Sequence, residues 1–398
     1  MNILIITPRI PYPPYRGDKL KIYNIGKQLL KNNAVTIITF LRNKKQLEEI
    51  GELRALNFNV LFIKITFFES CTNVLKALFS NIPFQVAWYS SSGMKKKVAE
   101  LLDSDKFDVA YFHLIRSAQF ICDDKPKSST LQVLDFTDAV SLYLNRFFTI
   151  EKNPLKKIFL GIEKKRIEKY EKVANQFDAV FICSEVDRNY LRKQGVKANI
   201  KVLRNGVDIQ QFTFDQVEYD RNRIIFTGNM PYYANYDAAI YFTKEIFPLI
   251  LKENPEANFY IVGQNPPLKV RSLQSNNVFV TGFVKNIKDE YLKSAVNIAP
   301  MRFGAGTLNK IIESLVIGVP VVATSIAIEG LPEEIKKLIN VADTPEDFAK
   351  QTALFLKNPE LRNQFLKLDK SHIKEILSWE NIVSHFEIDL REELKKIK

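Results

Sequence analysis

The stretch 297–330, NIAPMRFGAGTLNKIIESLVIGVPVVATSIAIEG, decides the fold class. The apolar run 296–300 at its start predicts a buried strand, and the run 320–324 predicts a second one. Between them, apolar residues recur at helical spacing from Thr307, which we expect to be the N-cap, to the stop signal at Gly318. A strand, a helix and a further strand in this order form a βαβ unit, so the stretch predicts a parallel sheet.

The loop between this strand and this helix predicts an anion site. Gly304 and Gly306 allow a ligand to approach the backbone, and the first amides of a helix are unpaired at the positive end of its dipole. Arg302 and Lys310 flank the loop with two more positive charges. Glu313, which we expect about two turns into the helix, would repel phosphate but accept hydrogen bonds from ribose hydroxyls. The set predicts a nucleotide with a diphosphate; the alternative is a βαβ unit whose glycines serve only tight turns.

At these residues the chain resembles the family-4 retaining glycosyltransferases of GT-B fold. The segment 306–313 (GTLNKIIE) is similar to the helix start of bacterial polysaccharide-biosynthesis sugar transferases, and the second conserved glutamate of the family falls on Glu313. Many members carry a further glutamate eight positions earlier, where this chain has Ala305. The resemblance implies a hexosyltransferase-like enzyme that retains configuration at the sugar and needs no metal ion or other cofactor.

The motif and the resemblance together assign candidate site residues. The expected catalytic residues are His113, Arg302, Lys310 and Glu313. The expected donor-binding residues are Gly228, Asn229, Gly263, Val284, Gly304, Ala305, Gly306, Thr307, Leu308 and Asn309. The expected residues of an acceptor or phosphate loop are Arg16, Gly17, Lys19 and Asp138. No metal ligands are assigned, because the chain has three histidines and lacks a D-x-D-like carboxylate pair near the phosphate loop.

Length and composition are typical of a folded protein with two domains. The chain has 398 residues, of which 46% are hydrophobic, so two cores can be filled. Cys71, Cys122 and Cys183 lie far apart and predict small buried hydrophobes rather than a disulfide framework or a zinc site. The first apolar run is too short for a signal peptide, and no run approaches about 18 apolar residues. We therefore expect a cytoplasmic protein.

Charge is distributed unevenly along the chain. Residues 1–205 hold 34 of the 57 Lys+Arg and 20 of the 45 Asp+Glu, a net charge of +14, whereas the remainder carries −2. A basic half indicates nucleic acid, an anionic membrane surface or an anionic substrate as partner. Nucleic acid is disfavoured, because the charges show no aromatic interleaving and no RNA-binding motif.

The segment 153–175 predicts a helix crowded with lysine, with Ile158 and Ile162 on or near one face. A solvated face is the ordinary interpretation of such a charge run. With two phenylalanines, Phe147 and Phe148, just upstream, attachment to the inner face of an anionic membrane is the second interpretation.

The N-terminal half alternates between apolar runs and helical stretches, which predicts a parallel sheet covered on both faces. The expected strands are 2–7, 34–40, 60–65, 107–113, 131–136, 178–183 and 200–203.

The loop Pro8–Asp18 (PRIPYPPYRGD) is too rich in proline for helix or strand, and Asp18 is expected to cap the helix that follows. Its one glycine, Gly17, forms no GxGxxG fingerprint, so dinucleotide binding is weakly indicated here. The resemblance implies that Arg16, Gly17 and Lys19 approach the donor phosphate and the acceptor. A rigid surface connection is the alternative.

Three polar residues lie at or just after the ends of the expected strands 107–113 and 131–136. His113 ends the strand FDVAYFH, and spacing alone favours a partly buried polar residue. The resemblance instead implies a histidine that contacts the donor sugar. Asp135 and Asp138 are each a candidate cleft carboxylate, and Asp138 is equally a candidate helix cap.

The turn Arg204–Asp208 (RNGVD) and the aperiodic polar segment after it predict a linker. We expect an acceptor-binding domain over 1–205, a donor-binding domain over 206–377, and a last helix over 378–398 that returns to the first domain. Further strands are expected at 223–229, 259–263, 278–283 and 298–301. The predicted fold is therefore α/β of GT-B type, in which two Rossmann-like domains with parallel sheets face each other across a cleft.

The function that this organisation implies is transfer of a sugar from a UDP- or GDP-linked donor to a glycan or lipid-linked acceptor in surface polysaccharide biosynthesis. Two alternatives remain. A GT-B nucleotide-sugar 2-epimerase would share the donor site but need acid/base carboxylates in the cleft. A catalytically silent nucleotide-sugar-binding protein would account for the alanine at Ala305.

Overall fold

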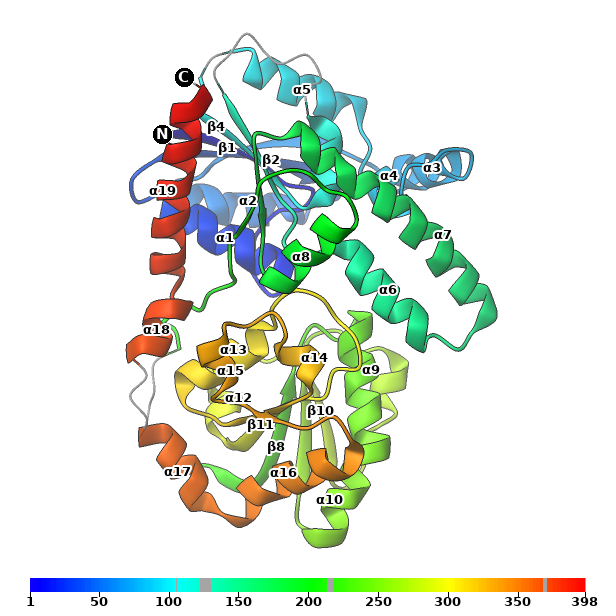
Figure 1. Cartoon of the computed structure of the whole chain (residues 1–398), viewed down its shortest axis with the longest axis vertical. Helices are drawn as coiled ribbons and strands as arrows, with labels where there is room; N and C mark the ends of the chain where they lie inside the picture. Colours follow the sequence, from blue (N-terminus) through cyan, green and yellow to red (C-terminus); the bar gives the residue numbers. More distant parts are fainter. Residues whose placement is uncertain (105, 122–129, 213–217, 368–370, 398) are drawn as a thin grey trace. The chain divides into compact units, whose positions relative to one another are not determined.

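The computed structural model describes residues 1–104, 106–121, 130–212, 218–367 and 371–397 (Figure 1). The chain forms two compact units, of which unit 1 is Met1–Arg204 with Ile382–Lys398 and unit 2 is Asn205–Asn381. The first break lies inside the predicted linker turn Arg204–Asp208. The second lies inside helix α19 (Trp379–Ile397) rather than before it. Cys122 lies outside the described residues.

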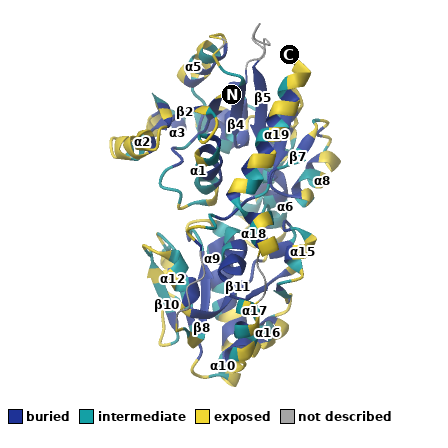
Figure 2. Ribbon diagram, turned by 90° about the vertical axis from the view of Figure 1, so that its left-hand side faces the viewer, coloured by how far each residue is buried: buried dark blue, intermediate teal, exposed yellow. Residues whose placement is uncertain are grey.

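Unit 1 is built on a seven-stranded parallel sheet in the order β3-β2-β1-β4-β5-β6-β7. Its strands are β1 (Asn2–Ile6), β2 (Ala34–Leu41), β3 (Asn59–Lys64), β4 (Val109–His113), β5 (Leu131–Asp135), β6 (Ala179–Ile182) and β7 (Ile200–Val202). Every strand expected in this half is confirmed to within two residues at either end. The central strands β4 and β5 are buried along their whole length because helices cover both faces of the sheet (Figure 2).

Helices connect these strands. They are α1 (Gly17–Leu29), α2 (Gln46–Ala55), α3 (Phe67–Ala77), α4 (Phe84–Ala87), α5 (Ser92–Leu102), α6 (Val140–Ile150), α7 (Pro154–Tyr170) and α8 (Glu185–Lys193), with 3₁₀ turns at Ile115–Phe120 and Glu171–Gln176. The end of α19 also belongs to this unit, because the ring of Phe386 packs 5.6 Å from that of Tyr111 and 4.9 Å from that of Phe181.

Unit 2 has a second parallel sheet of six strands, in the order β10-β9-β8-β11-β12-β13. Its strands are β8 (Asp220–Thr227), β9 (Asn258–Val262), β10 (Val278–Gly282), β11 (Ser294–Ala299), β12 (Val321–Ala323) and β13 (Asn340–Val341). Its helices are α9 (Tyr233–Tyr241), α10 (Phe247–Glu253), α11 (Leu268–Arg271), α12 (Ile287–Leu292), α13 (Asn309–Ile317), α14 (Ser325–Ile328), α15 (Glu333–Lys336), α16 (Pro345–Lys357), α17 (Pro359–Lys367) and α18 (Ser371–Leu377), with a π turn at Phe242–Ile246. Sequence analysis missed β13, whose two residues are too few to show a period.

The topology places the carboxyl ends of β8, β9 and β11 at one edge of the second sheet. The loops that follow them carry the candidate donor residues, which is where open parallel sheets bind ligands. No described helix is both long and apolar enough to cross a membrane. In the described part of the chain, no group of three or more His, Cys, Asp or Glu side chains is placed to hold a metal ion.

Candidate functional site

The start of α13 is the centre of the candidate donor site. The helix begins at Asn309, and its N-cap, Leu308, makes no side-chain capping bond. The expectation that Thr307 is the N-cap is therefore wrong, and Thr307 Oγ1 is buried without a hydrogen-bond partner. The first amides of α13 are left without a side-chain cap, as an anion site requires. Gly318 ends the helix at φ 94°, which confirms the predicted stop.

Of the two loop glycines, only Gly306 has a backbone conformation that favours glycine. Its φ is +74°, a conformation that side chains with a Cβ rarely adopt. Its carbonyl oxygen also lies against Gly330, where an added Cβ would sit 2.3 Å from it. A Cβ on Gly304 would meet nothing within 4 Å. The close approach at this loop is thus between two backbone segments, with Gly304 lying open beside them.

Lys310 is buried, with a relative exposure of 6%, instead of flanking the loop as a solvated cation. Its Nζ donates to Asn235 Oδ1 at 2.9 Å and lies 3.8 Å from the centroid of the Phe226 ring. Burial lowers the pKa of Lys310 to about 7, against the opposing effect of the Glu313 carboxylate. Lys310 is therefore able to gain or lose its proton near neutral pH.

Glu313 lies one turn into α13 rather than two, because the helix begins at Asn309. The hydroxyl of Tyr291 donates to Glu313 Oε2 at 3.0 Å, and the same hydroxyl lies 2.6 Å from Thr227 Oγ1. Burial raises the pKa of Glu313 to about 7, although the Tyr291 hydrogen bond and Lys310 oppose this shift. Sequence analysis missed Tyr291, which lies 22 residues away.

Arg302 forms a bidentate ion pair that the sequence did not indicate. Its Nε and Nη2 donate to the two carboxylate oxygens of Asp237 at 2.9 and 2.5 Å, and its guanidinium lies 5.1 Å from the centroid of the Tyr241 ring. The hydrogen bond to Asp237 raises the pKa of Arg302. The side chain keeps 43% of its surface exposed, so the guanidinium is held in place without being removed from solvent.

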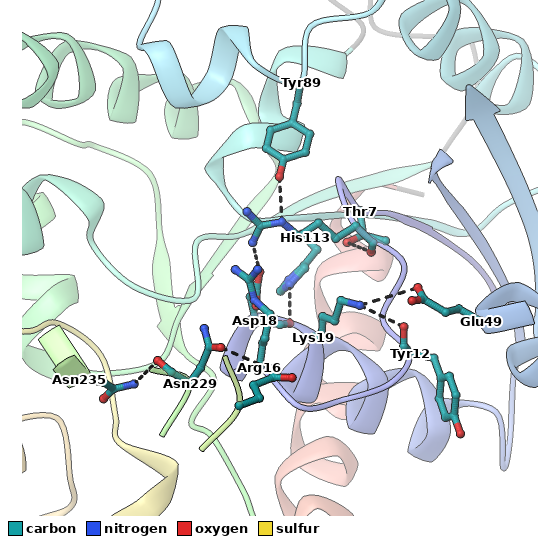
Figure 3. A network of polar contacts seen from close by, with 12 residues as sticks. Thr7, Tyr12, Arg16, Asp18, Lys19, Glu49, Tyr89, His113, Asn229 and Asn235 are labelled. Carbon is teal, nitrogen blue, oxygen red and sulfur yellow. Dashed lines mark hydrogen bonds and ion pairs between the residues drawn. The ribbon is translucent and has the colours of Figure 1, made fainter. Parts of the chain in front are cut away.

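Asn235 connects the remaining donor positions. Its Nδ2 donates to the carbonyl oxygen of Asn229 at 3.0 Å (Figure 3), and a Cβ on Gly228 would lie 2.7 Å from the same nitrogen. A Cβ on Gly263 would lie 1.8 Å from the carbonyl oxygen of Gly228, so these two loops approach too closely for any side chain. Val284 follows β10 and is partly buried.

The residue after the first break also contacts α13. Asn205 Nδ2 donates to Asn309 Oδ1 at 3.2 Å and to the carbonyl oxygen of Thr307 at 3.4 Å. Sequence analysis assigned this residue to a linker turn. Its contacts help to fix the start of the helix, and the sequence held no signal for a bond across about 100 residues.

In unit 1, His113 lies at the carboxyl end of β4 as predicted, but with a relative exposure of only 1%. Its Nε2 lies 3.0 Å from the carbonyl oxygen of Asp18 at the start of α1 (Figure 3). Its Nδ1 is buried without a hydrogen-bond partner and lies 3.7 Å from Asp135 Oδ2. The contact with a donor sugar stays a prediction.

Asp135 is a structural carboxylate rather than a cleft residue. It is fully buried, 2.9 Å from Lys21 Nζ, and accepts a hydrogen bond from the Tyr111 hydroxyl at 2.5 Å. Burial alone would raise the pKa of Asp135, but the charge of Lys21 holds it well below its usual range.

Asp138 does not cap α6, so that alternative is wrong. The N-cap is Ala139, whose backbone N–H donates to Asp187 Oδ1 at 2.8 Å. Asp138 is partly buried, and burial together with the nearby charge of Asp187 raises its pKa to about 7. A carboxyl group in this range is able to exchange a proton near neutral pH.

The loop before α1 is held by ion pairs among its own residues. Asp18 does not cap the helix, whose N-cap is Arg16 without a side-chain bond; Asp18 is instead paired with Arg9 and lies 3.2 Å from Arg16 Nε. Lys19 Nζ donates to the carbonyl oxygen of Tyr12 at 3.1 Å and lies 3.9 Å from Glu49 Oε2 (Figure 3). A Cβ on Gly17 would meet nothing. A role for this loop toward acceptor or phosphate stays a prediction.

Comparison with known proteins adds to this geometry. Residues 221–358 match the family model described as Glycosyl transferases group 1. A relative from Klebsiella pneumoniae, the "Uncharacterized 44.6 kDa protein in cps region", is 20% identical over 378 residues, which cover 90% of this chain and 91% of the relative.

Three solved structures have the same fold over nearly their whole length. Anabaena Alr3699/HepE in complex with UDP has a TM-score of 0.69 at 13% identity and covers 98% of this chain and 100% of its own. A variant of S. aureus TarM in complex with fondaparinux, alpha-GlcNAc-glycerol and UDP has a TM-score of 0.72 at 13% identity, covering 98% and 99%. Sucrose-phosphate synthase from Thermosynechococcus elongatus has a TM-score of 0.69 at 14% identity, covering 98% of each chain. The chain therefore has the GT-B fold, and the residues that match the family model of glycosyl transferases group 1 lie in its unit 2.

Proposed function

We propose that this protein is a retaining glycosyltransferase that moves a sugar from a nucleoside-diphosphate donor to a glycan or lipid-linked acceptor in surface polysaccharide biosynthesis. The observation that carries the proposal is the start of α13, where helix amides without a side-chain cap, Arg302, Lys310 and Glu313 occur within one family-matched region. Related support comes from HepE, solved with UDP and with UDP-glucose, and from the Klebsiella relative of the cps region.

In this proposal the diphosphate binds at the amino end of α13. Negative charge grows on the diphosphate as its bond to the sugar breaks, and fixed donors that meet this charge lower the barrier. The first amides of α13 and the guanidinium of Arg302 supply such donors. Arg302 needs no reorganisation, because Asp237 already holds it in place. These groups supply the positive charge that metal-dependent transferases obtain from a cation, so we propose metal-independent transfer.

Lys310 responds to the ligand in this scheme. With a pKa of about 7, it is only partly protonated at neutral pH before the donor binds. A diphosphate close to its Nζ favours the ammonium form, so the buried lysine gains its full charge when the anion arrives. This arrangement limits the cost of keeping an unpaired charge buried in the ligand-free protein.

Glu313 is proposed to accept hydrogen bonds from the ribose hydroxyls. The Tyr291 hydroxyl holds one of its carboxylate oxygens, which leaves the other free to face the ligand. The identity of the base and the sugar is then set by other contacts, for which Gly228, Asn229, Gly263 and Val284 are the proposed positions.

The acceptor is proposed to bind unit 1, near Arg16, Gly17, Lys19 and His113. Because this half carries the net charge of +14, we propose that the enzyme works at the inner face of an anionic membrane, where a lipid-linked acceptor would reside.

A screen of nucleoside diphosphates by thermal shift, followed by a transfer assay, tests the function. A native-state ligand raises the melting temperature, so UDP or GDP should stabilise the protein while the corresponding monophosphate has a smaller effect. Donor sugar should then be consumed only when an acceptor is present. No stabilisation by any nucleoside diphosphate would refute the donor site.

One observation favours a second candidate, the 2-epimerase. Asp138 has a pKa raised to about 7, as an acid/base carboxylate would need. Incubation of the protein with UDP-sugars in the absence of acceptor separates the two functions, because an epimerase converts its substrate alone. An NMR spectrum that shows only the starting sugar after prolonged incubation excludes the epimerase.

A further inference from the structure

Unit 1 exposes a concentration of large apolar side chains that we call the apolar face. Phe79 is 93% exposed, Leu155 79% and Phe68 78%. The face consists of Phe67, Phe68, Leu75, Leu78, Phe79 and Ile82 from α3 and the segment after it, with Leu155, Ile158, Phe159 and Ile162 from α7. Scattered exposed leucines are ordinary on soluble proteins, but a set of this size on two neighbouring segments marks an interaction surface.

The two segments of the apolar face are connected by hydrogen bonds and ring stacking, both directly and through α4. Arg166 on α7 donates to the carbonyl oxygens of Ala77 at 2.8 Å and Ile82 at 3.2 Å. Glu163, one turn earlier, accepts from the backbone N–H of Phe84 at 2.8 Å. The rings of Phe84 and Phe159 stack with centroids 5.3 Å apart. The face is therefore a preorganised surface rather than two independent helices.

Helix α7 packs on unit 1 with one side and exposes apolar residues on the other. Its buried residues are Leu160, Glu163 and Ile167, so Ile158 and Ile162 turn away from the core. Full burial of the four apolar side chains of this face on α7 would have stabilised unit 1, yet each of them keeps between 44% and 79% of its surface exposed. Their presence needs a partner that the described chain does not contain.

A cationic cavity borders the apolar face. It measures about 370 Å³ and is lined by Lys165, Arg166, Lys169 and Lys172, together with Ile162 of the face itself. One carboxylate, Glu168, also lines it and lies 3.6 Å from Lys164 Nζ. The lining therefore has an excess of positive charge, which suits a phosphate group.

We propose that the apolar face and this cavity together dock on a bilayer of anionic phospholipid, with Phe68 and Phe79 inserted at the boundary of headgroups and acyl chains and one lipid phosphate held in the cavity. A phospholipid supplies an apolar chain and an anionic headgroup side by side, as the apolar face and the cavity require. This rests on the proposed function only in giving the docked enzyme a lipid-linked acceptor; the docking itself needs no nucleotide.

The charge on unit 1 alone predicts attachment that salt removes, whereas insertion of aromatic side chains predicts a component that salt leaves in place. The two contributions can thus be separated. Phe68→Ser with Phe79→Ser should weaken vesicle binding about tenfold or more at both low and high salt. Lys165→Gln with Lys169→Gln and Lys172→Gln should weaken it strongly at low salt and little at high salt.

Co-sedimentation of the whole protein with vesicles tests the proposal, without nucleotide. Vesicles of phosphatidylcholine containing phosphatidylserine should pellet the wild type, and pure phosphatidylcholine vesicles should pellet much less. Soluble glycerophosphate in excess should not displace the protein, because it offers no apolar chain. Leu268→Ser is the matched control, since Leu268 is 80% exposed but lies in unit 2; it should bind as wild type.

Three outcomes would overturn the proposal. In the first, the wild type stays in the supernatant with anionic vesicles at low salt. In the second, the phenylalanine variant binds vesicles like the wild type. In the third, sedimentation velocity shows a wild-type dimer that becomes a monomer in that variant, which would make the face a contact between two copies. Each variant is also tested for UDP binding, which depends on unit 2. In the variants, weakened vesicle binding with intact UDP binding supports this inference. In the wild type, absent vesicle binding with intact UDP binding refutes this inference alone, whereas absent UDP binding with intact vesicle binding refutes the proposed function alone.

Discussion

Replacement of Glu313 by alanine is the sharpest test of the donor site. The variant removes the carboxylate that would accept the ribose hydroxyls. It does not orphan Tyr291, because that hydroxyl also lies 2.6 Å from Thr227 Oγ1. A carboxyl with a pKa raised to about 7 is also costly to bury, so its loss should destabilise the fold little. Binding and folding effects can therefore be separated at this position.

The expected loss in binding follows from the hydrogen bonds at stake. A hydrogen bond to a charged acceptor contributes about 1.5 to 3 kcal/mol, so Glu313→Ala should weaken UDP or GDP binding by about 10- to 150-fold. Glu313→Gln keeps the shape and one acceptor oxygen but loses the charge, and should fall between wild type and alanine. Isothermal titration calorimetry measures all three.

The control is Glu333→Gln, which changes a carboxylate of the same unit whose side chain is 84% exposed. It should bind the nucleotide like the wild type. An alanine variant at Glu313 that is folded by circular dichroism and binds the nucleoside diphosphate with unchanged affinity would refute the assignment of the ribose contact.

Three further predictions concern pH, phosphate and sugar. Nucleotide affinity should pass through a maximum near pH 7, because Glu313 must lose its proton to accept the ribose hydroxyls and Lys310 must keep its proton to meet the diphosphate, and both pKa values are about 7. Lys310→Met should abolish the decline in affinity on the alkaline side, and Glu313→Gln should reduce the decline on the acid side. Parallel declines in the wild type and both variants would contradict this. Arg302→Gln should lower kcat about 10²- to 10³-fold with little change in melting temperature, since the side chain is 43% exposed, and normal turnover would place the phosphate site elsewhere. His113→Gln should lower sugar transfer strongly while UDP binding by calorimetry stays near wild type; equal loss of both would assign His113 to the stability of unit 1.

Much of the fold was predictable because parallel strands buried on both faces have a strong sequence signal. The strands of both sheets are short apolar runs separated by helical stretches, and β13 alone is too short to be recognised. Gly318 was also readable, because a left-handed helix end favours glycine. Three helix starts could not be predicted from the sequence. Asp18, Asp138 and Thr307 all have side chains suited to capping, but the N-cap of each helix is a neighbouring residue, one or two positions away.

The candidate donor residues could be named from the motif around α13, but their burial, hydrogen-bond partners and pKa values could not. The sequence by itself determined that Arg302, Lys310 and Glu313 lie near one loop, because the twelve residues 302–313 of a loop and the helix that follows cannot spread far. Only the tertiary structure decided that Lys310 is buried against Asn235 and that Asp237 holds Arg302. These partners lie about 65 to 75 residues away, and burial and pKa depend on packing across that distance.

The same division holds for unit 1. The lysines of α7 are visible in the sequence, and so is the uneven charge of the two halves. The exposure of Ile158 and Phe79 is not, because helical periodicity shows that a helix has an apolar stripe but not whether that stripe is covered. Here the packing of α7 against the start of α4 buries Glu163, which accepts hydrogen bonds from the backbone N–H groups of Phe84 and Gln85, and the apolar stripe is left outside. The direction in which a helix turns its faces is decided by the elements packed against it.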